Sequence, residues 1–458
     1  MEKRFPLDSR LSFSQNCLMF APLTTPKPPH PLKARKELKA ISYPLCDEQQ
    51  FIFDVNESIK TLPMMIMFSG TFSERFSRDE IRRAVETCVQ TADVCNARCV
   101  VKEACWHMEF LPPHKPEIRS FHFSTEEEYQ RFRDQIIETE INNRDKLYHI
   151  FMFSIAGSLS HRIYFCFNHL IFDGLSALVL FEKIKNILIN PDAGMTLHPF
   201  SAFLKKKEDY KKSAKYLSDQ QFWEERFAEL AKCETLFEDV SDVKEASIRE
   251  LCFHTTKTFK QACFSYCSQK NIALHLLIVA ILAEQIHTKT GRKRFYLEIP
   301  IGNRLGTKEK NSIGIYEISP PYIFDFNQHD NLADLVASLQ QQTKNYYRHK
   351  DFDWNAAIYS EPYQKKYGPY IPQFCFSFFC SNTYLNVPFV HWYHLHAGSS
   401  FLPMTIYVHD FMDSETMTFS YVFWESYFTD EEITGMHKEM EARMTEVINS
   451  QPKEVHPA

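Results

Sequence analysis

The amino-acid sequence predicts an α/β fold that is made of two mixed α/β halves. The chain has 458 residues, which is more than one compact core usually holds, so two subdomains are expected. Segments with a helical spacing of apolar residues alternate with short apolar segments that are typical of strands. The Asn-Pro-Asp-Ala-Gly sequence at residues 190–194 interrupts this pattern and marks the end of the first half.

The first half is expected to follow an irregular N-terminal segment. Residues 1–41 are assigned as an extension, because the prolines within residues 24–31 lack a backbone donor and fix φ, which excludes helix and interior strand. Residues 42–195 are assigned as the first subdomain, in which Ser77 is a candidate cap for a helix at Arg75–Ala92. The other expected elements are a helix at Thr125–Glu140, strands at Lys146–Phe153 and His161–Phe167, and a helix at Leu175–Ile189.

The second subdomain is assigned to residues 196–458. It is expected to open with a long charged helix at Phe203–Ala231, which could connect the two halves. Thr429 with Glu432 three residues later forms a capping box that begins a closing helix at Asp430–Ile448. The other expected elements are helices at Thr258–Ser268 and Ile272–Thr288, and strands at Ser247–Phe253, Arg294–Ile299, Phe374–Cys380, His391–His396, Met404–His409 and Thr416–Trp424.

Composition and charge exclude several classes of function. A net charge of −6 argues against a general binder of nucleic acid or of anionic membranes. The thirteen cysteines are scattered and include no CxxC pair, as expected of reduced thiols in a cytoplasmic protein. The longest apolar helical segment, Leu274–Ala283, is too short to span a bilayer, and Met1–Leu23 lacks the apolar core of a signal peptide. We therefore expect a cytoplasmic monomer with no contact to a membrane.

Three histidines near the end of the chain are the only candidate metal cluster. His394 and His396 would share one face of a strand, and His391 lies close by in the sequence. No acidic or cysteine ligand stands beside them. We expect no metal site there.

The strongest candidate for chemistry is the segment Asn168–Gly174, which reads NHLIFDG and lies between two apolar runs. A junction between strand and helix is a good place to display a catalytic side chain. A histidine in an apolar segment can simply be packed in a core, but the imidazole of His169 could also take a proton from an amine or an alcohol at neutral pH. Gly174 permits a turn that other residues cannot make.

Asp173 has two possible roles. It could be a second catalytic group, because burying two ionisable side chains in one short segment is costly unless they are used or paired. It could instead pair with a buried arginine and hold the loop in shape. The best candidate partner is Arg304, which directly follows the strand expected at Arg294–Ile299.

These residues resemble a known motif. Asn168–Gly174 is similar to the HHxxxDG motif of the chloramphenicol acetyltransferase-like superfamily, and within it the chain resembles the condensation domains of nonribosomal peptide synthetases. The resemblance covers about residues 42–450. Four further segments match those of the family in the same order: Tyr43–Gln50 with Gln49 retained, Pro300–Arg304, Ser312–Tyr316 and His349–Trp354.

The resemblance implies a V-shaped pseudo-dimer of two chloramphenicol acetyltransferase-like subdomains, with His169 near the middle of a central tunnel. Both substrates would arrive as thioesters on the phosphopantetheine arms of peptidyl or acyl carrier proteins, so the enzyme would need no cofactor or metal of its own. His169 would deprotonate or position the acceptor amine, which attacks the donor thioester to form an amide. The Gly174 N–H would help to orient the reacting carbonyl, and Asp173 with Arg304 would keep the loop in shape.

The sequence also departs from the family pattern. Asn168 stands in place of the first motif histidine, which is usually seen as structural, and Asn can still donate and accept hydrogen bonds. The family's RHExLRTxF segment is hardly recognisable around Gln90–Arg98, and its RDxSRNP segment is absent before Phe374. With no adenylation or carrier segment, we expect a free-standing condensation enzyme or an excised domain. Two alternatives stay open: an ester- or amide-forming acyltransferase with a free small-molecule acceptor, and a non-catalytic, condensation-like scaffold.

Overall fold

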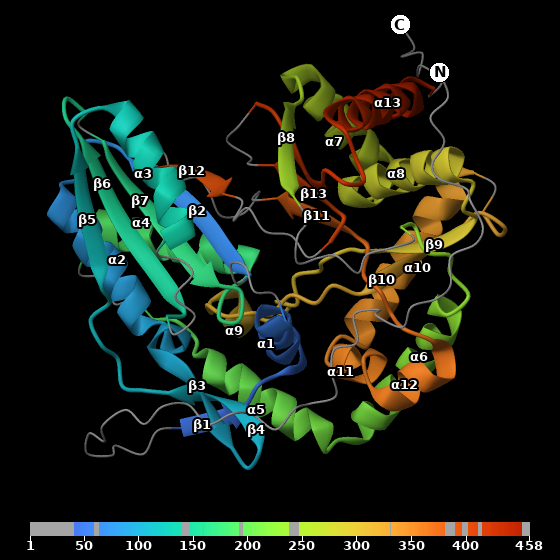
Figure 1. Cartoon of the computed structure of the whole chain (residues 1–458), viewed down its shortest axis with the longest axis horizontal. Helices are drawn as coiled ribbons and strands as arrows, with labels where there is room; N and C mark the ends of the chain where they lie inside the picture. Colours follow the sequence, from blue (N-terminus) through green and yellow to red (C-terminus); the bar gives the residue numbers. More distant parts are fainter. Residues whose placement is uncertain are drawn as a thin grey trace, which may run out of the picture.

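Two sheet-based halves lie side by side in the computed structural model of the chain (Figure 1). Of the extension assigned to residues 1–41, only Ile41 is among the residues that the structure describes. The described residues are 41–58, 64–139, 146–158, 160–191, 196–237, 247–329, 331–380, 390–395, 402–410 and 415–450.

The first half is built on a five-stranded sheet in the order β12-β2-β7-β6-β5. Alternate residues of β7 enter two different cores: Phe165 and Phe167 pack with α2 and α4, whereas Tyr164 and Cys166 pack on the side of α3. Burial of both faces explains why this strand is apolar almost throughout. The bounds are β2 (Met65–Phe72), β5 (Ile118–Phe123), β6 (Tyr148–Ile155), β7 (His161–Asn168), α2 (Arg78–Thr91), α3 (Glu126–Thr139) and α4 (Gly174–Ile189).

The second half is built on a six-stranded sheet in the order β10-β9-β11-β13-β14-β8. One face of this sheet, with Phe376 and Ile406, packs against the helices in the larger core. The other face carries Ser377 and Phe379, and Phe379 lies against Gly174 of the first half. The bounds are β8 (Ile248–His254), β9 (Arg294–Glu298), β10 (Pro321–Asp325), β11 (Phe374–Cys380), β13 (Met404–Asp410), β14 (Thr418–Trp424), α7 (Lys257–Lys270), α8 (Leu274–Thr290), α10 (Leu332–Arg348) and α13 (Asp430–Asn449).

A small third sheet, in the order β1-β4-β3, lies below the first half in Figure 1. Next to it, α1 is joined to α11 of the second half, because the Asp47 carboxylate accepts the backbone N–H of Asn355 at 2.9 Å and of Ala356 at 2.7 Å. The two halves are thus linked near this sheet as well as at Gly174. The bounds are β1 (Ile41–Pro44), β3 (Ala97–Lys102), β4 (Cys105–Phe110), α1 (Asp47–Ser58), η1 (Asp93–Asn96), α9 (Thr307–Lys310), α11 (Trp354–Ile358) and α12 (Glu361–Tyr367).

The prediction of one long helix at Phe203–Ala231 is wrong, because two helices occupy this region. Helix α5 (Phe200–Lys211) ends before Ser213, and α6 (Ala214–Leu230) begins after it. The Ser213 side chain accepts the Tyr216 N–H and so caps α6. A serine that bonds the first turn of a new helix offers the backbone an alternative to helix continuation.

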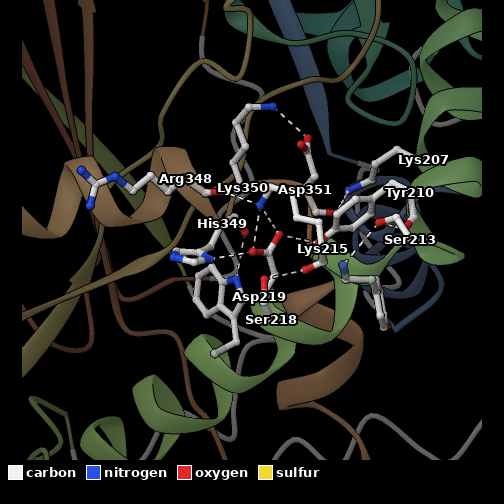
Figure 2. A network of polar contacts seen from close by, with 12 residues as sticks. Lys207, Tyr210, Ser213, Lys215, Ser218, Asp219, Arg348, His349, Lys350 and Asp351 are labelled. Carbon is white, nitrogen blue, oxygen red and sulfur yellow. Dashed lines mark hydrogen bonds and ion pairs between the residues drawn. The ribbon is translucent and has the colours of Figure 1, made fainter.

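A buried carboxylate stabilises the bend between these helices (Figure 2). Asp219 accepts hydrogen bonds from the Tyr210 hydroxyl at 2.7 Å, from Lys215 Nζ at 2.6 Å and from His349 Nδ1 at 2.7 Å. Lys215 also donates to the Arg348 carbonyl at 2.8 Å. The network therefore ties the α5–α6 bend to the end of α10 and to the segment at His349 that the sequence singled out.

Strand β12 (Val390–Leu395) differs from the sequence-based assignment. It pairs antiparallel with β2, from Val390 opposite Phe72 to Leu395 opposite Met67. It therefore belongs to the sheet of the first half, although the sequence places it in the second subdomain at 196–458. Without β12, β2 would leave a row of unpaired backbone groups at the sheet edge.

The helix caps predicted at Ser77 and Thr429 agree with the starts of α2 and α13 in the structure. The capping box predicted at Thr429 and Glu432 is present at the start of α13, and Ser77 caps α2 with a second such box. No single helix among the described residues has the length and apolarity to cross a membrane. The pair α7 and α8 would pass together on those two criteria, but it is bent by 102°.

Candidate active site

His169 lies in the loop that joins β7 to α4. Its backbone N–H donates to the Met64 carbonyl at 2.8 Å, which continues the pairing of β7 with β2 by one residue. Its side chain is 12% exposed. The strand thus fixes the backbone while a small part of the side chain stays accessible.

The two ring nitrogens of His169 have different partners. Nδ1 lies 2.7 Å from the Phe172 carbonyl oxygen, and because a carbonyl can only accept, Nδ1 is the donor. Nε2 lies 3.4 Å from Oε1 of Glu317. Burial lowers the pKa of His169, but the hydrogen bond and charge of Glu317, the Phe172 carbonyl and Asp173 together raise it above its ordinary value of 6.5.

Asp173 is fully buried and caps α4. One carboxylate oxygen accepts from the backbone N–H and the hydroxyl of Ser176, both at 2.8 Å. The other accepts the Tyr316 N–H at 3.0 Å. Both oxygens are therefore engaged in holding the loop, and His169 Nε2 has its contact with Glu317 instead.

Arg304 reaches Asp173 from the second half, as the sequence predicted. Its Nη2 lies 2.6 Å from Asp173 Oδ1, and both side chains are buried. Nη1 donates to the Glu309 and Ser312 carbonyls at 2.9 and 2.6 Å. The guanidinium carbon lies 4.2 Å from the centre of the Tyr316 ring. The pairing is present in the structure, and its importance for activity stays a prediction.

Asn168 is buried and forms local hydrogen bonds. Its Oδ1 accepts from the Leu170 N–H at 3.0 Å and from Asn56 Nδ2 at 3.4 Å. The bond to Leu170 is the kind by which Asn stabilises a turn. Gln49 binds the same turn through a 3.0 Å hydrogen bond to the Leu170 carbonyl. Both side chains therefore support the loop.

Gly174 is the first residue of α4, where backbone N–H groups have no partner within the helix. A Cβ atom at this position would lie 3.3 Å from Phe379 Cε2, so β11 approaches the helix start closely. This N–H is close in sequence to His169. The catalytic roles of His169 and Gly174 remain predictions.

Sequence reasoning missed Glu317 as a part of this site. Its carboxylate follows the apolar run from Ile313 to Tyr316. Burying a charged group is costly, and this argument, which made Asp173 a candidate, could have identified Glu317 as well. Nothing in the sequence showed that it lies beside His169, because 148 residues separate the two.

Among the described residues, no three His, Cys, Asp or Glu side chains lie close enough together to hold a metal ion. His396 and the side chains of His391 and His394 lie outside the described part of the chain. The described cysteines are free thiols.

A family model named "Condensation domain" matches residues 42–455, which is most of the chain. The chain belongs to this family. The match starts at the segment Tyr43–Gln50 and includes the loop at His169 and the segment at Arg304. It therefore agrees with the resemblance expected from the sequence.

Curated relatives of this condensation domain are much longer proteins. It is 19% identical over 288 residues to surfactin synthase subunit 1 of Bacillus subtilis, which is 61% of this chain and 8% of the relative. It is 20% identical over 193 residues to the dimodular nonribosomal peptide synthase of the same organism, which is 40% of this chain and 8% of the relative. The chain spans less than a tenth of the length of these relatives.

Solved structures share the fold at low sequence identity. The first condensation domain of the CDA synthetase has a TM-score of 0.73 at 14% identity, over 90% of this chain and 97% of that one. The condensation domain of the Monacolin K polyketide synthase MokA has a TM-score of 0.74 at 10% identity, over 90% and 98%. The fold is that of the chloramphenicol acetyltransferase-like pseudo-dimer, and membership of the family supports a role in condensation by acyl transfer.

Proposed function

We propose that the chain is a condensation enzyme of the nonribosomal peptide synthetase type, which transfers an acyl group from a carrier-protein thioester to an amine and forms an amide. The observation that carries this proposal is the geometry of His169. Nδ1 is occupied by the Phe172 carbonyl, whereas Nε2 lies on a partly exposed side chain. Nε2 faces the partly exposed Glu317 carboxylate at 3.4 Å and is the ring nitrogen that can exchange a proton with a substrate.

The proposed reaction uses these positions. The acceptor nitrogen attacks the thioester carbonyl, a C–N bond forms, and the C–S bond then breaks. Protons leave the nitrogen and one reaches the departing thiolate, with His169 Nε2 as an exchanging group. The Gly174 N–H donates to the carbonyl oxygen as it becomes negative, which is the role of an oxyanion-hole donor. Asp173 and Arg304 hold the loop in this geometry.

Carrier proteins would supply the phosphopantetheine arms that hold the two substrates. Donor and acceptor would reach His169 through a tunnel between the two halves, on phosphopantetheine arms of acyl or peptidyl carrier proteins. In this proposal His169 supplies the base and the acid, and the Gly174 N–H supplies the oxyanion donor. The enzyme therefore needs no metal or cofactor of its own.

The test is amide formation from a carrier protein loaded with an acyl thioester, detected by mass spectrometry. His169→Ala should lower the rate at least about 100-fold, which is typical of removing a general acid–base group, while carrier binding is kept. His122→Ala, an exposed histidine on β5, is the matched control and should keep the wild-type rate.

Three results would refute this proposal in different ways. Equal rates for wild type and His169→Ala would remove the role of the imidazole. Products formed only with free amines or alcohols would favour a small-molecule acceptor over a carrier-bound one. Carrier binding without turnover in the wild type, under conditions that load the donor, would favour a scaffold.

A further inference from the structure

Glu317 is the acidic group that reaches His169 from the second half. It directly follows Tyr316, whose backbone N–H donates to Asp173, so the clamp on the loop also places Glu317. Its Oε1 lies 3.4 Å from His169 Nε2, and its side chain is 25% exposed. A substrate that meets Nε2 therefore meets this carboxylate too.

The hydrogen bonds of His169 determine the charge of this pair. Because Nδ1 donates to the Phe172 carbonyl, a neutral ring would carry a lone pair on Nε2. A lone pair beside a carboxylate oxygen is repulsive, whereas an N–H is attractive. The pair is therefore favourable when the ring is an imidazolium, in agreement with the raised pKa of His169.

The other titratable groups near His169 and Glu317 do not supply the negative charge that Glu317 supplies. Asp173 makes a smaller contribution than Glu317 to the raised pKa of His169, and it is paired with Arg304 on the loop side. From the six-stranded sheet, Cys375 of β11 and Tyr407 of β13 feel the charge of Glu317, and burial raises the pKa of both groups, so both stay uncharged at neutral pH. Among the described residues, Glu317 is thus the carboxylate that contributes most to the balance of the imidazolium charge.

We propose that Glu317 is a second catalytic acid–base residue, which takes the first proton of an acceptor that arrives as an ammonium ion. This inference rests on the proposed condensation function and names its acceptor as a basic amine. One ammonium proton passes to Glu317, and the neutral amine attacks the thioester. His169 gives its Nε2 proton to the departing thiolate and then takes the second proton from the new C–N nitrogen. Glu317 releases its proton to water, so the net products are an amide, a thiol and one proton.

The first test uses the protein alone. Histidine labelled with ¹³C at Cε1 is titrated by NMR, and His169→Asn assigns the His169 signal. Glu317→Gln should lower the His169 midpoint by about 1 pH unit or more, since a nearby opposite charge is lost. Glu317→Asp should keep a part of the shift. The matched control is Glu250→Gln, which removes a carboxylate of β8 that bonds Ser420 and should leave the midpoint unchanged. An unchanged midpoint in Glu317→Gln overturns the proposal.

The second test uses two acceptors on the same carrier, glycine and aminooxyacetate. The aminooxy nitrogen is weakly basic and is already neutral at pH 7, so it needs no first proton acceptor. Glu317→Gln should slow the glycine reaction at least about tenfold and the aminooxyacetate reaction much less, as expected when one acid–base group is lost. Equal losses of rate with both acceptors overturn the proposed role of Glu317 but leave the condensation function standing. Absence of product from the wild type with both acceptors refutes the condensation function and, with it, this role.

Discussion

Replacement of Asp173 by Ala is expected to destabilise the fold because it leaves the Arg304 charge buried without its partner. Asp173 accepts four hydrogen bonds: from Arg304, from the Ser176 N–H and hydroxyl, and from the Tyr316 N–H. Arg304 is only 5% exposed, so water cannot easily replace the carboxylate as the partner of its guanidinium. The variant would also lose the cap of α4.

The magnitude follows from these contacts. Removal of one partner from a buried ion pair costs about 3–5 kcal/mol, and loss of a helix N-cap costs about 1 kcal/mol. The same oxygen serves both roles, so the two terms overlap and we expect a total of about 3–5 kcal/mol. This is a large share of the roughly 5–15 kcal/mol by which a domain is usually stable.

Urea denaturation followed by tryptophan fluorescence and circular dichroism measures this change. Asp209→Ala, which removes an exposed aspartate of α5, is the control and should leave the midpoint within error. The double variant Asp173→Ala with Arg304→Met should lose less stability than the sum of its single variants, because the stranded charge is gone. Additive losses, or an unchanged midpoint in Asp173→Ala, would refute the coupling inferred from the structure.

Two further outcomes are expected. Gly174→Ala should lower the rate of amide formation about tenfold while stability changes by less than about 1 kcal/mol, because the new Cβ forces only a small shift of Phe379 but disturbs the position of the helix start. A second change, Phe379→Leu, should restore the rate. A rate that Gly174→Ala leaves unchanged would contradict the dependence of the rate on the position of the helix start. Burial lowers the pKa of His409 to about 4. Between pH 6.5 and 4 the unfolded chain therefore binds a proton that the folded chain does not, so this group makes stability fall as the pH falls, by up to about 1.4 kcal/mol per pH unit. In His409→Phe this acid-side slope of the unfolding free energy should become smaller, and an identical slope in wild type and variant would contradict the assignment.

Local features of the chain could be predicted because their causes are local. The capping box at Thr429 and the strand before His169 follow from side chains within a few residues of each other. The break at Ser213 was missed, although its cap is local, because charged residues on both sides continue a helical pattern. Helical periodicity outweighed a single capping residue in the prediction, and the buried network at Asp219 favours the bend.

The candidate site was predictable only in part. His169 and Asp173 stand in one motif, and Arg304 could be proposed because a buried carboxylate needs a cation. The pairing of Glu317 with His169 could not be predicted, because an acidic residue in an apolar segment gives no indication of which residue will lie beside it. The pairing depends on how the second half approaches the loop.

The sequence by itself determined the α/β class, the motif loop after β7 and the charges that must be compensated, because periodicity and the cost of burial act along the chain. Only the tertiary structure decided that β12 joins the sheet of the first half and that Glu317 meets His169 Nε2. Both are contacts between segments more than a hundred residues apart. Their geometry is decided by the packing of the two halves, which no local pattern of residues encodes.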